Sequence, residues 1–305
     1  MFKSMKVRPT AWRTSIDSPR KSRVSRSMLL GSLIVMEVIG ATLVAPGLAS
    51  AAPLGAPRLS GYTLVETDGT VPADGQGHIT ASCPSGDDVL GGGGYQSTQN
   101  TQESLNSSYP ISDTAWSVYF NNASSGSVTG VTIAYCASSS SLKKYSVSTG
   151  PSETVPANSD LQVTATCPAK TVSLGGGWFN DSDEVTAGAT MSAPLGTNGW
   201  RAFVAAGPVS TPGRALAVCA KEPAGWAQVS SGYSSVPAGS QTTVGIACPS
   251  GSRVVGGGSF DSSDDSLVLI GLTDSFSSKK GWQSAVNNNT GSAVSADAWG
   301  VCIER

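Results

Sequence analysis

The chain has 305 residues, only 13% of them charged, and its 19 basic and 21 acidic residues are unevenly distributed. Eight of the basic and two of the acidic residues lie in the first 51 positions, which leaves 11 basic and 19 acidic residues, a net charge near −8, for the remainder. Such a surface disfavours nucleic acid and anionic membranes as partners, because both need a basic face.

The first segment, residues 1–51, is predicted to be a signal peptide. A basic region precedes an apolar stretch from Met28 to Val44, and Ala49-Ser50-Ala51 follows as a small-residue cleavage site. A membrane anchor is the alternative, but the apolar stretch is shorter than the ~20 residues that a span needs, and Glu37 interrupts it. We therefore expect cleavage after Ala51, secretion, and no membrane span in the mature protein.

The rest of the chain contains a threefold repeat, in which V-P-A-x9-C-P-x6-G-G-G recurs without any change of spacing. The three copies start at Val71, Val155 and Val236. In each copy, a Trp and a second cysteine follow the glycine run, and an aromatic residue precedes the V-P-A motif. The predicted β repeats span 61–137, 144–220 and 225–305, joined by short linkers at 138–143 and 221–224.

The strands are predicted from alternating apolar residues. Ile79-x-Ala81-x-Cys83 leads into the first cysteine, Trp116-x-Val118-x-Phe120 gives a strand around the Trp, and Val131-x-Ile133-x-Tyr135 precedes the second cysteine. This period of two indicates strands with one buried face. The fold class is therefore all-β, with three units of about 80 residues that are either β-sandwich-like beads or packed around a pseudo-threefold axis; the short linkers favour packing.

Six cysteines in an exported chain predict a disulfide framework. Separations of 53, 52 and 54 residues make one bond per repeat the simplest pairing. The expected bonds are Cys83–Cys136, Cys167–Cys219 and Cys248–Cys302. Zinc is disfavoured, because no C-x-x-C occurs and His78 is the only histidine.

The repeat resembles a module of secreted actinobacterial proteins, in which a C-P…G-G-G…W…C unit occurs singly or in tandem. The resemblance covers residues 61–305 and depends on the cysteines, the glycine run and the Trp. It implies an extracellular location and no particular activity.

Neither the glycine runs nor the histidine predicts catalysis. A phosphate-binding loop needs a lysine after its glycines, and none follows here. A bulge or a close approach of two backbones explains the glycines better. A Ser-His-Asp set would require His78, whose counterparts in the other repeats are Gln162 and Thr243. We expect His78 to be a solvent-facing strand residue, and we expect no cofactor.

The loops after the glycine runs differ between repeats, and they contain the candidate ligand-binding residues. Asp181 and Asp183 follow the second run, whereas Asp261 and Asp264 follow the third. A solvated hairpin is favoured over a calcium site and over the carboxylate pair of a glycoside hydrolase.

The tryptophans of the repeated strand are expected in the core, although sugar stacking is an alternative for them. Trp178 and Trp299, which lack counterparts in all three repeats, are candidates for exposed ligand contacts. The predicted function is a non-enzymatic interaction or structural protein at the cell surface or in the medium. The alternative is a lectin-like carbohydrate binder, and a secreted hydrolase is less favoured. A polysaccharide or another surface protein is the expected partner.

Overall fold

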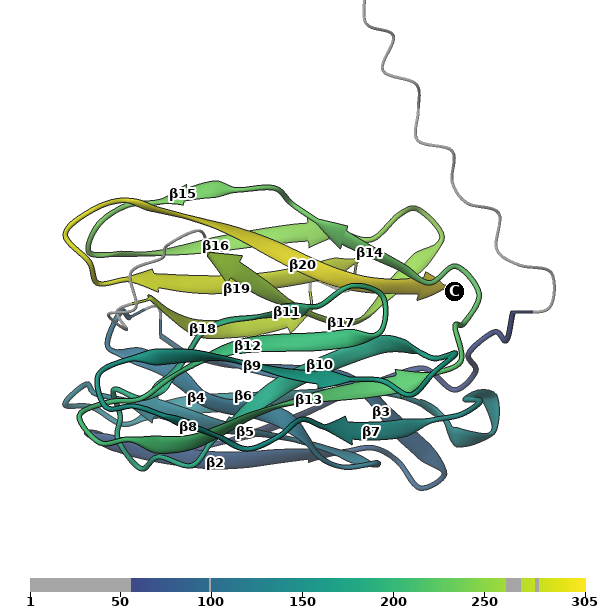
Figure 1. Ribbon diagram of the computed structural model, residues 1–305, viewed down its shortest axis with the longest axis horizontal. Helices are drawn as coiled ribbons and strands as arrows, with labels where there is room; N and C mark the ends of the chain where they lie inside the picture. Colours follow the sequence, from purple (N-terminus) through teal and green to yellow (C-terminus); the bar gives the residue numbers. More distant parts are fainter. Residues whose placement is uncertain (1–55, 99, 262–269, 278–279) are drawn as a thin grey trace, which may run out of the picture. The chain divides into compact units, whose positions relative to one another are not determined.

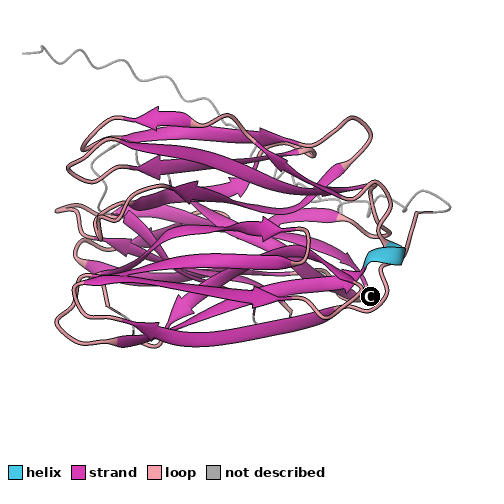
Figure 2. Ribbon diagram, turned by 90° about the horizontal axis from the view of Figure 1, so that it is seen from below, coloured by secondary structure: helices cyan, strands magenta, loops and turns pink. Residues whose placement is uncertain are grey.

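The computed structural model describes residues 56–98, 100–261, 270–277 and 280–305, with only the backbone of 270–277. The predicted signal peptide, 1–51, and the candidate Asp264 lie outside the described residues. The described chain is built of antiparallel strands, with one short 3₁₀ helix, η1, at Ser139–Ser141 (Figure 2). The all-β prediction is confirmed. Within the described part of the chain, no helix has the length and hydrophobicity that a membrane span requires.

Residues 61–137, 144–220 and 225–305, which we call segments 1, 2 and 3, have a similar order of strands, except that one long strand at the start of segment 1 corresponds to two short strands in segments 2 and 3 (Figure 1). Segment 1 contains β1 (Thr63–Val71), β2 (Gly75–Ser82), β3 (Asp87–Gln96), β4 (Glu103–Ser112), β5 (Ala115–Asn122) and β6 (Val128–Ser138). Segment 2 contains β7 (Ser146–Thr149), β8 (Glu153–Val155), β9 (Asp160–Thr166), β10 (Val172–Asn180), β11 (Gly188–Pro194), β12 (Gly199–Ala205) and β13 (Thr211–Ala220). Segment 3 contains β14 (Ala227–Ser230), β15 (Ser234–Val236), β16 (Ser240–Ala247), β17 (Ser252–Asp261), β18 (Ile270–Ser277), β19 (Gly281–Asn288) and β20 (Val294–Glu304).

Each segment contributes two groups of paired strands, and the groups join across segment boundaries. In segment 1, β6 pairs with β1 and β3, while β5 pairs with β2 and β4. Strand β4 then pairs with β10 of segment 2, and β11 of segment 2 pairs with β17 of segment 3. The results are two seven-stranded sheets. The path of the first runs β2-β5-β4-β10-β13-β7, with β8 also paired to β13, and the path of the second runs β14-β20-β17-β11-β12-β9, with β15 also paired to β20. Strand β18 in turn lies against β3, so that the three segments meet in a closed cycle.

The first glycine of each G-G-G run lies where the segments meet. A Cβ on Gly175 would lie 2.7 Å from the carbonyl oxygen of Leu90, and one on Gly256 would lie 2.6 Å from that of Leu174. A Cβ on Gly91 would overlap the carbonyl oxygen of Val255, which completes the cycle. These runs are therefore points of backbone approach between segments, as the sequence predicted, because only glycine leaves room there.

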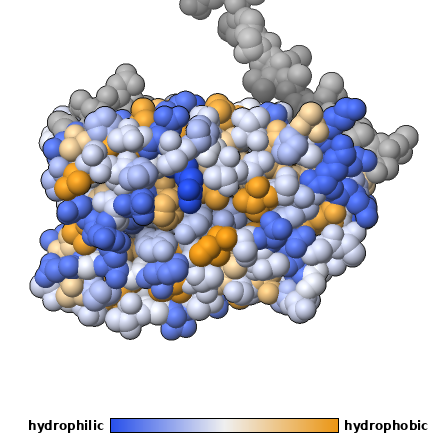
Figure 3. Space-filling view, turned by 60° about the horizontal axis from the view of Figure 1, so that its bottom comes forward, coloured by the Kyte–Doolittle hydropathy of each residue, from blue (hydrophilic) through white to orange (hydrophobic). Residues whose placement is uncertain are grey.

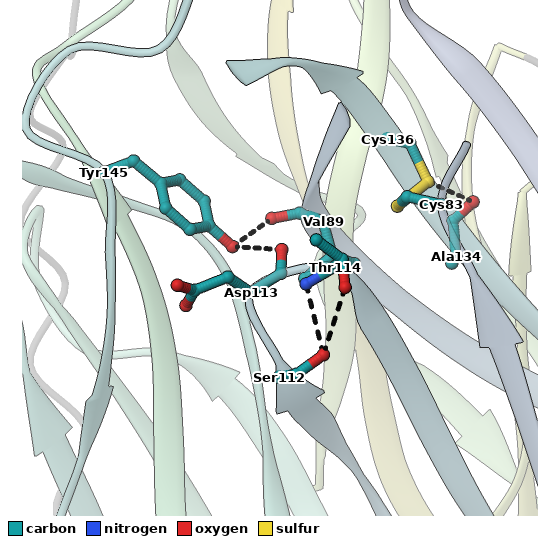
Figure 4. Close-up of a disulfide and its surroundings, with 8 residues drawn as sticks. All are labelled: Cys83, Val89, Ser112, Asp113, Thr114, Ala134, Cys136 and Tyr145. Atoms are coloured by element: carbon teal, nitrogen blue, oxygen red, sulfur yellow. Dashed lines mark hydrogen bonds between the residues drawn. A yellow bond between two sulfur atoms is a disulfide. The ribbon is translucent and has the colours of Figure 1, made fainter. Parts of the chain in front are cut away.

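The aromatic residue that precedes each V-P-A motif fixes its segment to the preceding one in the same cycle. The Tyr145 hydroxyl of segment 2 donates to the carbonyl oxygen of Val89 in segment 1 over 2.8 Å, and Figure 4 shows this contact beside a disulfide. Tyr62 donates to Val254 over 2.7 Å, and the indole N–H of Trp226 donates to Ser173 over 3.0 Å. Burial raises the pKa of Tyr62 to about 12 and raises that of Tyr145 as well, so both hydroxyls stay protonated donors.

The core contains the repeated tryptophans and the disulfides. Trp116, Trp200 and Trp282 are fully buried, each against the second glycine of its own run, so the core prediction for them is confirmed. All six cysteines are bonded in the predicted pairs Cys83–Cys136, Cys167–Cys219 and Cys248–Cys302. Residues Ser50–Arg305 group as one unit rather than as separate beads.

Candidate functional site

The phenylalanine that follows the second and the third glycine run is directed away from the core. In the second run, Trp178 is buried in the core while the next residue, Phe179, is half-buried. Phe260 has the same place in the third run. Because successive side chains of a strand point to opposite faces, the buried tryptophan places Phe179 on the outer face of its sheet.

On the first seven-stranded sheet, Phe179 belongs to a row of planar side chains that crosses five neighbouring strands. The sheet order β2-β5-β4-β10-β13 places one residue of the row on each strand. In that order the row consists of His78, Tyr119, Tyr109, Phe179 and Arg214, which we call the aromatic row.

Neighbouring members of the aromatic row interact with one another. His78 stacks on Tyr119 with ring centroids 4.1 Å apart and an interplanar angle of 11°. Tyr119 lies close enough to Tyr109 to contribute to the raised pKa of Tyr109, and Tyr109 meets Phe179 edge-on at 5.2 Å. The Arg214 guanidinium lies 4.8 Å from the centre of the Phe179 ring. Such cross-strand pairs stabilise a sheet. The row also crosses the boundary between segments 1 and 2, where β4 pairs with β10.

The electrostatics of the aromatic row leave one positive charge at one end. Burial raises the pKa of Tyr109 to about 12, and burial lowers the pKa of His78, so both are neutral at pH 7. Arg214 remains charged, and its Nε is buried with no hydrogen-bond partner. The ion pair formed among the described residues joins Arg58 to Glu304, and Arg214 has no part in it.

The second seven-stranded sheet has a related cluster at its own segment boundary. The guanidinium of Arg201 on β12 lies 4.6 Å from the centre of the Phe260 ring, and Tyr233, which is 58% exposed, meets Phe260 at 6.4 Å. Asp297 lies opposite Phe260 on the neighbouring strand, as Arg214 lies opposite Phe179 in the first sheet. The second sheet therefore has a carboxyl group where the first has a guanidinium group. Burial raises the pKa of Asp297, although the indole N–H of Trp299 and the charge of Arg201 oppose the shift.

The residue that fills the space beside the ring also differs between the two sheets. Tyr109 covers one side of Phe179, whereas the matching position on β11 is Ala193. The small alanine leaves room for Arg201, one strand farther away, to reach over Phe260. The same scaffold therefore presents two different outer faces.

Two of the predicted ligand contacts need correction. Trp178 is only 3% exposed, and its indole N–H donates to the carbonyl oxygen of Asn106 over 2.6 Å, so the prediction of an exposed ring is wrong for this residue. Trp299 is half-buried on β20, beside Asp297. Asp261 is buried at the end of β17, so its side chain is not solvated as the predicted hairpin required.

Asp181 and Asp183 are exposed, as a solvated loop requires, but the backbone of their loop fastens segment 2 to segment 1. The carbonyl oxygen of Ser182 accepts hydrogen bonds from Gln76 over 3.1 Å and from Asn106 over 2.9 Å. Among the described residues, no three His, Cys, Asp or Glu side chains converge as the ligands of a metal ion would. The loop therefore has a structural role that its acidic sequence did not indicate.

Among the residues that the structure describes, the contact of His78 with Ser117 is the arrangement that suggests nucleophilic chemistry. Nε2 of His78 lies 2.6 Å from Oγ of Ser117, and Thr80 Oγ1 lies 2.7 Å from the same hydroxyl. Ser117 is 0% exposed, so a substrate carbonyl has no access to it. His78 itself is exposed on β2, which confirms the expectation of a solvent-facing strand residue.

Sequence analysis missed the aromatic row because its members come from five strands that are not consecutive in the chain. A usable signal was present: the fourth residue after the start of each glycine run is aromatic in all three repeats, at Tyr95, Phe179 and Phe260. Comparison with known proteins gives no matching family model and no matching curated protein.

Proposed function

We propose that this chain is a secreted, non-enzymatic binding protein, which acts at the cell surface or in the extracellular medium. Its ligands bind to the outer faces of the two seven-stranded sheets, at the boundaries between segments. The aromatic row carries this proposal, because its planar side chains lie on the outer face of the sheet, where His78 is exposed and Tyr119, Phe179 and Arg214 are half-buried around the buried Tyr109.

Three further observations support an extracellular binding role. The first 51 residues have the order of a signal peptide. All six cysteines are disulfide-bonded, which is typical of oxidising compartments. The face shown in Figure 3 has hydrophobic residues scattered among neutral and hydrophilic ones, as expected for a protein that stays in solution.

The variation on a common scaffold also favours binding. Arg214 in one sheet and Asp297 in the other have equivalent positions beside a phenylalanine. A scaffold that keeps its core and changes its outer side chains is suited to recognising different groups of one ligand or several ligands.

A lectin-like protein is the second candidate, and the chemistry of the aromatic row favours it. The row combines ring faces with the polar atoms of Tyr119, His78 and Arg214. A sugar has the complementary surface, since its ring carries both C–H groups and hydroxyl groups.

The test is to purify the secreted protein and measure its binding to an array of polysaccharides and, in parallel, to intact cells with and without surface proteolysis. We expect saturable binding to at least one of these surfaces without any change in the ligand. Release of soluble sugars or peptides would contradict a non-enzymatic role, and the absence of binding to every surface would contradict a binding protein.

A further inference from the structure

We infer that the aromatic row is a platform for one extended, neutral polysaccharide chain, which lies across strands β2, β5, β4, β10 and β13. This inference rests on the proposed binding function and names its ligand class. His78 contacts Tyr119, and Phe179 contacts both Tyr109 and Arg214. Tyr119 lies close enough to Tyr109 to affect its pKa, so the two groups of contacts adjoin.

The dimensions of the row fit a chain of rings. Neighbouring strands lie about 4.8 Å apart, so five strands give a row roughly 19 Å long, and its width is one side chain, about 7 Å. A narrow line of this length accommodates several sugar rings placed end to end. A compact ligand such as a single sugar would contact only one or two of the five side chains.

The same dimensions disfavour a folded protein as the partner. The row covers on the order of 130 Å² by these spacings, whereas a stable protein interface buries about 800 Å² on each partner. Protein interfaces also place their anchor residues in pockets, but the members of this row lie side by side on consecutive strands of one sheet.

The charges of the site favour a neutral ligand. Residues 52–305 carry a net charge near −8, which repels polyanions over long distances. Within the row, Arg214 supplies a single cation, while Tyr109 and Phe179 are uncharged at pH 7. One guanidinium serves to fix the position of a hydroxyl-rich chain through hydrogen bonds, because its planar donors are already oriented by stacking on Phe179.

The platform requires two segments of the protein. His78, Tyr119 and Tyr109 belong to segment 1, whereas Phe179 and Arg214 belong to segment 2. The pairing of β4 with β10 holds the two groups in line. Rings on both sides of this boundary should therefore contribute to the affinity for the same chain.

The experiment measures depletion of the secreted protein by amorphous cellulose, chitin and xylan, with polygalacturonate as the anionic comparison. The variants are Tyr119→Ala in segment 1 and Phe179→Ala in segment 2. Tyr119→Phe keeps the ring, and Val209→Ala removes an exposed apolar side chain elsewhere in segment 2. The melting temperature of each variant shows that it is folded.

We expect binding to at least one neutral polysaccharide, weakened roughly three- to tenfold by each alanine substitution in the row. Val209→Ala should bind as the unmodified protein does, and Tyr119→Phe, which keeps the ring, should bind more tightly than Tyr119→Ala. Unchanged affinity in both row variants, or binding to polygalacturonate alone, would overturn the inference and leave the binding function intact. Binding to cell-surface protein without any binding to polysaccharide would likewise overturn the inference of a polysaccharide ligand and leave the proposed binding function intact. A protein that binds none of these surfaces would contradict the binding function as well.

Discussion

Gly175→Ala tests whether the three segments are held together by backbone contact. The added Cβ would lie 2.7 Å from the carbonyl oxygen of Leu90 and 2.9 Å from the Cα of Gly91, both in segment 1. Real Cβ atoms do not approach other atoms this closely, and neither neighbour is a side chain that can rotate away. Segments 1 and 2 must therefore move apart, or the strand must bend.

Overpacking of this kind costs about 1–3 kcal/mol. For a unit of this size, each kcal/mol lowers the melting temperature by roughly 2–4 °C, so we expect a decrease of about 2–12 °C. Gly126→Ala is the matched control, because no atom lies within 4 Å of the Cβ that it would gain. Substitution of an unhindered glycine is neutral or slightly stabilising.

The assay is equilibrium unfolding of both variants and the unmodified protein in denaturant, followed by tryptophan fluorescence and by circular dichroism. A free energy of unfolding for Gly175→Ala that equals that of Gly126→Ala within about 0.5 kcal/mol would refute the reasoning. It would show that the close approach of Gly175 to segment 1 does not exist in solution.

Three further predictions follow from the charges and bonds described above. Glu103 is 1% exposed, and burial raises the pKa of its carboxyl group above the ordinary value of 4.5. Ionisation of this buried carboxyl group therefore lowers the free energy of unfolding as the pH rises from 4.5 through the raised pKa. Glu103→Gln should therefore be more stable than the unmodified protein at pH 7 and lose this advantage below about pH 4; equal pH profiles would contradict the assignment. Replacing Cys83 and Cys136 together by alanine should lower the free energy of unfolding by about 4 kcal/mol in the chain-entropy treatment, measured in denaturant. N-terminal sequencing of secreted protein should begin at Ala52, and intact protein retained in the membrane would contradict the predicted cleavage.

The sequence predicted much of the local structure, because local structure depends on patterns that lie close together in the chain. Alternation around Trp116 and before Cys83 identified the strands and their buried faces, and both strands are observed. The cysteine spacing gave the three disulfides correctly. The glycine runs indicated close backbone approach, although not that the approaching backbone belongs to another segment.

The candidate site could not be predicted in the same way, because it depends on which strands are neighbours. Periodicity placed Tyr119 on the face opposite to Trp116, but the order β2-β5-β4-β10-β13 is needed to bring it beside His78 and Tyr109. The lack of counterparts of Trp178 in the other repeats does not indicate exposure. Trp178 is buried, and its indole N–H reaches Asn106 of the neighbouring segment.

Calorimetry of the secreted protein most directly tests the central claim, that sheets shared between segments make one unit and place the candidate site on its boundaries. We expect a single heat-absorption peak whose calorimetric enthalpy equals the van't Hoff enthalpy, because no segment can unfold without breaking a sheet that it shares. Three separable transitions, or a calorimetric enthalpy about three times the van't Hoff value, would contradict the claim, because independently folding segments would give that result.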